Sequence, residues 1–267
     1  MISRRRIAIC VAFALGVATL MIQSPAGAIY GGNYVKFGSY RWMVSLRLAS
    51  SPNAHVCAGT LIAPDMVLTA AHCVDGHHQH DFVAVVGVDA PSWQAARKVP
   101  VLGFREPGSF NGSADSNKDD IAVLRLAVPQ TGPTIGLATA QPKVGAALST
   151  AGWGCTGRPP SCGQVPSLRL KVTEQTVLAD SECGATVFKT PRFYGPTALC
   201  TKGTGTVNGG DSGGPLLVGN PNKGFVETGV TSMDTDNPSK LYASFTSVPR
   251  ERPWIHEAIL ALRAARL

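Results

Sequence analysis

The heptapeptide Gly209-Gly210-Asp211-Ser212-Gly213-Gly214-Pro215 surrounds one serine with four glycines. Glycine adopts strained turns that other residues avoid, and it lets a backbone approach a ligand closely. The apolar run Pro215–Val218 that follows has the length and composition of a β-strand. The stretch therefore predicts a tight turn that presents Ser212 at the start of a strand. Such a turn alone is usually an ordinary loop, so its meaning depends on the rest of the chain.

Two further motifs precede this turn. They are Leu68-Thr69-Ala70-Ala71-His72-Cys73 and Asp119-Asp120-Ile121-Ala122-Val123-Leu124. A serine hydroxyl is a poor nucleophile at neutral pH and needs a base within hydrogen-bond reach. A histidine can accept its proton and return it to the leaving amine, while an aspartate fixes the tautomer of the histidine. Each motif alone is more often structural, but together they predict a triad of His72, Asp120 and Ser212.

The glycines beside Ser212 predict a second feature of this chemistry. A tetrahedral intermediate carries an oxyanion that needs preorganised donors, and we expect the N–H groups of Gly210 and Ser212 to supply them. An esterase is the alternative, because its nucleophile motif G-x-S-x-G also fits these letters. That motif requires a helix after the serine, whereas Pro215–Val218 predicts a strand.

The composition favours a β-rich protein. Of the 267 residues, 44% are hydrophobic and only 15% are charged, and glycine (29) and proline (19) are abundant. Helical periodicity is clear only at Trp254–Leu262, with Pro253 in the first turn. A coarse division falls near residues 135–145. The predicted strands are Trp42–Leu48, Thr60–Ala63, Val67–Thr69, Phe82–Val88, Ile121–Leu126, Ala147–Ala151, Leu168–Gln175, Pro215–Val218, Glu227–Thr231 and Leu241–Thr246.

The N-terminus has the pattern of a secretory signal peptide over residues 1–28. Arg4, Arg5 and Arg6 precede the apolar stretch Ile7–Ile22, and Ala26-Gly27-Ala28 is a small-residue cleavage site. An uncleaved membrane anchor is the alternative, but the stretch is short for a spanning helix. We therefore expect a secreted protein without stable membrane association.

Charge and cysteines agree with export. Residues 29–267 carry 21 basic and 17 acidic residues, a scattered net charge of +4, and no nucleic-acid-binding motif is visible. Of seven cysteines, Cys10 lies in the predicted signal, and the other six suit three disulfides in an oxidising compartment. No C-x-x-C pair occurs, which argues against zinc. We expect no metal and no cofactor.

On these motifs the sequence resembles the chymotrypsin–trypsin family of serine peptidases over essentially all of residues 29–267. The resemblance extends to Ile29-Tyr30-Gly31-Gly32, Gly152-Trp153-Gly154 and Trp254-Ile255. It implies an all-β fold of two packed six-stranded antiparallel barrels, with the active site between them. The first barrel would span about 29–140, the second about 141–250, and a C-terminal helix about 253–265.

The resemblance also implies roles for other residues. Asp120, rather than its neighbour Asp119, takes the place of the family's acid because it directly precedes the apolar strand. The α-amino group of Ile29 would pair with Asp211 and order the oxyanion loop; because its pKa is about 8, the pair should weaken at alkaline pH. Since Ala28 immediately precedes Ile29, signal cleavage would itself release this amine.

Three disulfides are implied by the same resemblance. They are Cys57–Cys73 beside the histidine, Cys183–Cys200 in the second barrel and Cys155–Cys162, a short local bridge. A further family bridge beside the specificity pocket is absent, because Asn208 occupies the position of its first cysteine.

The pocket residues depart from the trypsin pattern. Thr206 stands where trypsin-like members carry the aspartate that selects Lys or Arg, and Ser232-Met233-Asp234 replaces Ser-Trp-Gly. Lys240 falls where most members carry glycine, an arrangement similar to the arginine of aspartate-directed granzymes. A cation there would favour an acidic side chain before the cleaved bond, the P1 residue. The alternatives are that Lys240 faces solvent or an acidic neighbour, and that P1 is apolar or broadly chosen.

The expected partners are polypeptide substrates and protein inhibitors, with no nucleic acid, and the expected state is a monomer. A metal could be held by His77, His78, His80 and Asp81, although a solvated polar loop is the favoured interpretation. Asn111-Gly112-Ser113 is a formal glycosylation sequon. The rival to a peptidase is a secreted homologue that binds without cleaving, which the intact triad argues against.

Overall fold

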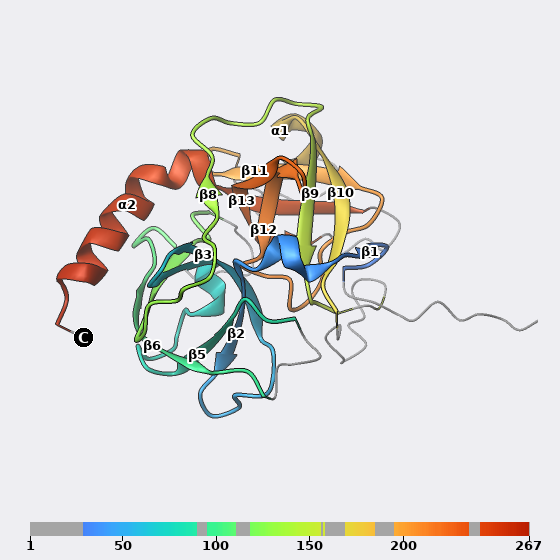
Figure 1. Ribbon diagram of the computed structural model, residues 1–267. Helices are drawn as coiled ribbons and strands as arrows, with labels where there is room; N and C mark the ends of the chain where they lie inside the picture. The colour runs from blue at the N-terminus through green and yellow to red at the C-terminus, as the bar shows by residue number, and fades with distance from the viewer. Residues whose placement is uncertain are drawn as a thin grey trace, which may run out of the picture.

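Two closed antiparallel β-barrels and one long C-terminal helix make up the computed structural model (Figure 1). It describes residues 29–89, 95–110, 118–155, 157, 169–184, 195–234 and 241–266. Each barrel has six strands, as the resemblance implied. The lower barrel in Figure 1 comes from the first half of the chain and the upper barrel from the second half.

The first barrel closes in the order β2-β3-β4-β7-β6-β5. Its strands are largely buried and rich in apolar residues; all four residues of β4 are buried. Two short 3₁₀ turns, η1 (Phe37–Tyr40) and η2 (Ala71–Cys73), flank this barrel's strands. The strands are β2 (Met43–Leu48), β3 (Cys57–Ala63), β4 (Met66–Thr69), β5 (Phe82–Val86), β6 (Val99–Arg105) and β7 (Ala122–Leu126).

The second barrel follows the path β10-β11-β14-β13-β12-β9 and closes where β9 pairs with β10. Its core includes Leu148, Leu199, Leu216 and Phe245 from four different strands. A short helix, α1 (Asp180–Gly184), precedes β11. The strands are β9 (Ala147–Gly152), β10 (Lys171–Val177), β11 (Ala198–Gly203), β12 (Pro215–Asn220), β13 (Gly224–Asp234) and β14 (Tyr242–Ser247).

The predicted first barrel, about 29–140, includes two segments that bond instead to the second barrel. β1 (Asn33–Tyr34) pairs with β10, and β8 (Gly136–Leu137) pairs in parallel with β13. The side chain of Ile29 is fully buried, and Tyr30 forms a bridge with Thr206. The start of the described chain therefore lies against the second barrel.

The C-terminal helix α2 runs from Val248 to Ala264, so it begins before the predicted position of about 253. Pro249 occupies the first turn, where a missing N–H costs nothing, and Pro253 lies inside the helix. α2 follows the second barrel, and its C-terminal end comes alongside the first (Figure 1). There it contacts β7, where Arg125 donates to the carbonyl of Leu262 at 2.7 Å.

Several sequence-based expectations concern residues that the structure does not describe. They include the signal peptide or membrane anchor at residues 1–28 and the sequon at Asn111. No helix within the described ranges is long and apolar enough to span a bilayer.

Candidate active site

His72 and Asp120 meet because the strands that carry them are paired. β4 and β7 are antiparallel with Thr69 opposite Ala122, so the residues just beyond β4 lie beside those just before β7. Asp120 Oδ2 lies 2.7 Å from Nδ1 of His72, and its Oδ1 accepts the backbone N–H of His72 at 2.9 Å. The acid thereby fixes the histidine at two points, as the triad requires.

The second barrel holds the same carboxylate. The Ser232 hydroxyl donates to Asp120 Oδ2 at 2.6 Å, and the Thr246 hydroxyl donates to the Asp120 carbonyl at 2.8 Å. Burial alone would lower the pKa of His72, but the charge and hydrogen bond of Asp120 outweigh it and raise that pKa above its usual 6.5. The adjacent Asp119 accepts a hydrogen bond from Ser109 and has a positive φ of 53°, so its side chain is engaged elsewhere.

The turn with Ser212 packs against the strands that lead to His72. Ala58 of β3 donates to the Ser212 carbonyl at 2.8 Å, and Gly213 donates to the Thr231 carbonyl at 2.8 Å. Gly213 has a φ of +78°, and a Cβ there would collide with Ala58 and with Thr69, at the end of β4. The glycine thus permits the close approach that brings Ser212 to this edge of the first barrel.

Among the described residues, no hydrogen bond joins the Ser212 hydroxyl to the His72 ring. Such bonds often tighten only in the substrate complex. A strand, β12, follows Ser212, as predicted, rather than the helix that the esterase motif requires.

The backbone of residues 208–214, all of which the structure describes, leaves two donors open. Within this segment the N–H groups of Gly210 and Ser212 have no intramolecular acceptor. These are the two groups predicted to bind an oxyanion. The other five amides are satisfied: Asn208 by Asp211 Oδ2, Gly209 by Asn208 Oδ1, Asp211 by the Asn208 carbonyl, Gly213 by the Thr231 carbonyl and Gly214 by the Asp211 carbonyl.

Asp211 is buried beneath this turn. Its carboxylate accepts the N–H groups of Gly154 at 2.7 Å and Asn208 at 2.9 Å, and the absence of side chains at Gly152 and Gly154 provides its space. Burial raises the pKa of Asp211 to about 7, against the effect of these two donors. Ile29, its predicted partner, is fully buried with a φ of +50°. The strained conformation at a β-branched residue marks the junction where cleavage is predicted.

A cavity of about 150 Å³ lies directly beside Ser212. Thr206 does not line it, because its hydroxyl is buried and donates to the Tyr242 carbonyl at 2.9 Å. Lys240 falls outside the described residues. Among the described residues that line it, only Asp234 is charged; these residues are Val207, Asn208, Gly209, Ser212, Thr231, Ser232, Met233 and Asp234.

Sequence reasoning missed two residues at this site. Ser232 was assigned to the pocket wall, and its bond to Asp120 was not foreseen. His55 was not singled out, yet its Nε2 lies 2.8 Å from the carbonyl oxygen of Gly210. No local pattern identifies His55, because its partner is 155 residues away in the sequence.

The cysteines are joined largely as the resemblance implied. Cys57–Cys73 links the start of β3 to the residue after His72, and Cys183–Cys200 joins α1 to β11. Cys155 is also disulfide-bonded, whereas Cys162 lies outside the described residues. The Cys57–Cys73 bridge ties the strand that holds the Ser212 carbonyl to the turn that carries His72.

The other candidate sites do not converge. In the described part of the chain, His77, His78, His80 and Asp81 form no cluster with metal-binding geometry; His77 Nδ1 is 3.7 Å from Asp81 Oδ2 on the surface. Cys57, His72 and Cys73 lie close together, but the disulfide occupies both sulfurs.

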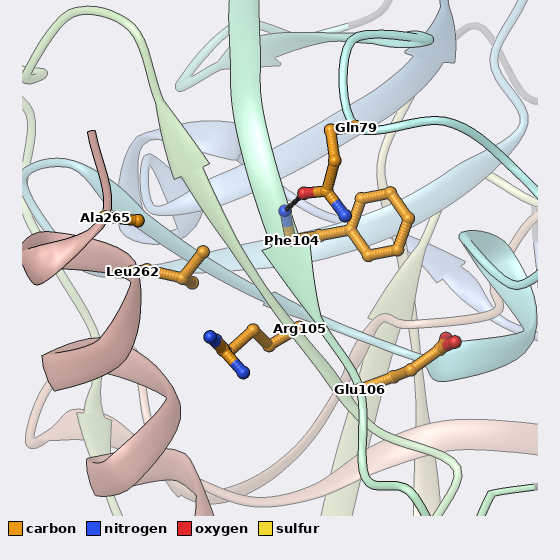
Figure 2. Close-up of a pocket in the computed structure, with 6 residues that line it drawn as sticks. All are labelled: Gln79, Phe104, Arg105, Glu106, Leu262 and Ala265. Carbon is orange, nitrogen blue, oxygen red and sulfur yellow. Dashed lines mark hydrogen bonds between the residues drawn. The ribbon is translucent and has the colours of Figure 1, made fainter. Parts of the chain in front are cut away.

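A larger cavity of about 410 Å³ lies between the end of β6 and the last turn of α2, away from Ser212. Figure 2 shows Arg105 directed toward the helix and Glu106 directed away from it, so these charges do not face a common point. The polar groups of this cavity therefore form no constellation like the one around Ser212.

Comparison with known proteins agrees with this geometry. A family model described as Trypsin matches residues 29–255. Trypsin delta of Drosophila melanogaster is 29% identical over 237 residues, 86% of this chain and 87% of that protein. Trypsin alpha-4 of Lucilia cuprina is 29% identical over 259 residues, 94% of this chain and 95% of that protein. Among solved structures, the mouse brain serine protease neuropsin superimposes with a TM-score of 0.70 at 24% identity, covering 86% of this chain and all of that chain.

Proposed function

The chain belongs to the trypsin family of serine endopeptidases, and on that premise we propose that it cleaves polypeptides through an acyl-enzyme formed on Ser212. His72 acts as the base that takes the serine proton and then as the acid that protonates the leaving amine. Asp120, held by Ser232, keeps the imidazole in the required tautomer. Water then enters, and the same histidine activates it to hydrolyse the acyl-enzyme. No cofactor takes part.

The observation that carries this proposal is the pair of open N–H groups at Gly210 and Ser212. They are the two amides of residues 208–214 without an intramolecular acceptor, and one belongs to the nucleophile itself. Donors fixed in advance stabilise an oxyanion without reorganising during the reaction, which is the largest single contribution in many hydrolases. A homologue that binds without cleaving has no need of such donors.

We propose that the P1 pocket takes an uncharged side chain, apolar or small. Thr206 has its hydroxyl engaged with Tyr242, and Val207 and Met233 contribute apolar surface to the cavity wall. Asp234 also lines the cavity, but it has another interaction within the protein, so we do not assign its charge to the P1 side chain. The rival acidic preference depends on Lys240, which the described residues do not include.

The mature protein, we propose, is secreted and begins at Ile29. Cleavage after Ala28 would free an α-amino group close to the second barrel, because Tyr30 already bridges Thr206 there. An ammonium that reached Asp211 would stabilise its ionised form, which burial now disfavours. N-terminal sequencing of the secreted protein would contradict this if the chain began before Ile29.

Digestion of a diverse peptide library, with the cut sites identified by mass spectrometry, tests the activity and the pocket together. Ser212→Ala is the matched control, because it removes one oxygen and leaves the fold intact. We expect cuts after uncharged residues that disappear in the control. Cuts after Asp or Glu would assign the selecting role to Lys240, and cuts after Lys or Arg would assign it to Asp234. No cuts by the mature wild-type protein would favour the binding homologue.

A further inference from the structure

A line of hydrogen bonds runs from the interior of the first barrel to the turn beside Ser212. Arg47 and Ser45 lie two residues apart in β2, so their side chains share one face of the strand. Arg47 Nε donates to Ser45 Oγ at 3.0 Å, and Ser45 Oγ lies 2.8 Å from Nδ1 of His55. On the other side of the ring, Nε2 lies 2.8 Å from the carbonyl oxygen of Gly210.

The chemistry of the two ends fixes every proton in this line. A guanidinium only donates and a carbonyl only accepts. The ring of His55 must therefore carry its proton on Nε2, facing Gly210. In neutral histidine Nδ1 is then an acceptor, so the Ser45 hydroxyl must donate to it, while its oxygen accepts from Arg47. Reversing any one bond would place two donors or two acceptors face to face.

The end of this line is the oxyanion turn. Cys155 N–H holds the Gly209 carbonyl and Ala58 N–H holds the Ser212 carbonyl, whereas the Gly210 carbonyl is held by the His55 side chain. Gly210 has a φ of +92°, a conformation that only glycine adopts readily. The direction of this carbonyl sets the peptide plane between the two open N–H groups.

We propose that Arg47 is a positioning residue for the oxyanion turn, acting through Ser45 and His55 on the Gly210 carbonyl. This rests on the proposed role of Ser212 and names a residue, three hydrogen bonds away, that maintains the geometry of its turn. Arg47 is completely buried, and its Nη1 is anchored on the Pro52 carbonyl at 2.9 Å. A buried guanidinium is costly to retain, and here its directed Nε–H fixes the Ser45 hydroxyl as the donor to Nδ1 of His55, which matches the tautomer that the Gly210 carbonyl requires.

The charge of Arg47 also keeps the His55 ring neutral. Burial is the main cause that lowers the pKa of His55 to about 4, and Arg47 lowers it further, while the bond to Gly210 opposes both. The ring lies against Trp153 in an edge-to-face contact, with 5.9 Å between ring centroids. A neutral ring has one proton to place, so a unique tautomer and a unique direction for Gly210 follow.

The test combines ring ¹⁵N spectra of His55 with steady-state kinetics on a peptide substrate. We expect the wild type to carry its His55 proton on Nε2. In Arg47→Met and in Ser45→Ala, Nδ1 of His55 should lose its fixed donor, so the ring resonances should broaden or shift and the pKa of His55 should change. kcat should fall about tenfold at nearly constant KM, less than the roughly 10²–10³-fold cost of losing a whole oxyanion donor. Arg47→Lys, which retains a charged donor, should recover part of kcat.

Arg125→Met is the matched control, since Arg125 also lies in a strand of the first barrel but donates to carbonyls of the C-terminal segment. It should leave the His55 spectrum and kcat unchanged. Arg47→Met removes a large buried group and can destabilise the fold. Ser45→Ala removes only one oxygen, so it serves as a second, milder variant that breaks the same line of hydrogen bonds. The double variant should lose no more kcat than the worse single variant, because both break one line.

Two results would overturn the proposal. One is a wild-type protein whose His55 carries its proton on Nδ1. The other is a Ser45→Ala or Arg47→Met variant that folds and keeps the same kcat as the Arg125→Met control. If the wild type cleaves nothing, the proposed function fails. The ¹⁵N spectra of the wild type, Arg47→Met, Ser45→Ala and Arg125→Met still decide whether Arg47 directs the His55 ring.

Discussion

Glu227 is a carboxyl group buried at the junction of the two barrels. It belongs to β13 and is fully buried, and the Thr60 hydroxyl of β3 donates to its Oε2 at 2.5 Å. Its Oε1 has no hydrogen-bond partner among the residues that the structure describes. Burial raises the pKa of Glu227 to about 8, although the bond from Thr60 opposes this. The folded protein should therefore hold this residue protonated at neutral pH.

Replacing Glu227 with glutamine should change how stability depends on pH. Between pH 4.5 and about 8 the unfolded chain releases the Glu227 proton while the folded chain retains it, so wild-type stability falls as pH rises. At about 1.4 kcal/mol per pH unit, this loss is about 3 kcal/mol or more between pH 5 and pH 8. Glu227→Gln cannot ionise and escapes the loss. Its amide nitrogen takes the place of the unpartnered oxygen at a constant cost of about 1–3 kcal/mol.

The assay is urea unfolding at pH 5, 6.5 and 8, followed by tryptophan fluorescence, with Ser212→Ala in both proteins to prevent self-digestion. We expect Glu227→Gln to be no more stable than its parent at pH 5 and clearly more stable at pH 8. Other buried acids, such as Asp211 and Glu251, contribute equally to both proteins, so the difference isolates Glu227. A difference in unfolding free energy that stays constant over this range would refute the reasoning.

Three further predictions concern the site. Ser232→Ala removes a charge-assisted hydrogen bond to Asp120. It should lower kcat/KM on a peptide ester by about tenfold with little change in KM. An unchanged rate would show that the Ser232 hydroxyl is not needed to orient the acid. The pKa of His72 is raised above 6.5, and the base must be neutral to accept a proton. We therefore expect kcat/KM to increase with pH through a midpoint above 6.5, and Asp120→Asn to lower that midpoint. A wild-type midpoint at or below 6.5 would contradict this. Gly213→Ala should cost about 1–3 kcal/mol in thermal or urea unfolding and abolish most activity, because its Cβ collides with Thr69; a fully active variant would show that the turn can relax.

The strands that were predicted from the sequence are those with short apolar or alternating runs between turn residues. Phe82–Val88 was predicted as a strand and ends two residues early, at Val86, because Gly87 turns with a φ of +67°. β6 was not named, since Pro100 and Gly103 interrupt its pattern. Pro100 is nevertheless tolerated opposite Val83, beside a register shift between Val101 and Gly103. Such irregular strands are recognised by the neighbours they pair with, which a local pattern does not contain.

The same limit applies to the site. His72, Asp120 and Ser212 each lie in a short motif from which the triad is predicted. The bond from Ser232 to Asp120 spans 112 residues of sequence, and the bond from His55 to Gly210 spans 155. Only the closure of both barrels and their packing together create these contacts. Sequence therefore identifies the reacting groups better than the residues that position them.

The path of α2 has a consequence for when the protein becomes active during its synthesis. This helix is made after both barrels, yet it packs on both: Ile255, Ala258 and Leu262 join the buried cluster that contains the first barrel's core, and Arg252 donates to the Leu137 carbonyl of β8. Ser212 and His72, the proposed nucleophile and base, lie on different barrels, so we expect their alignment to require this late packing. A chain emerging from the ribosome or from an export channel should thus have no proteolytic activity until the helix is released, which protects the machinery that handles it.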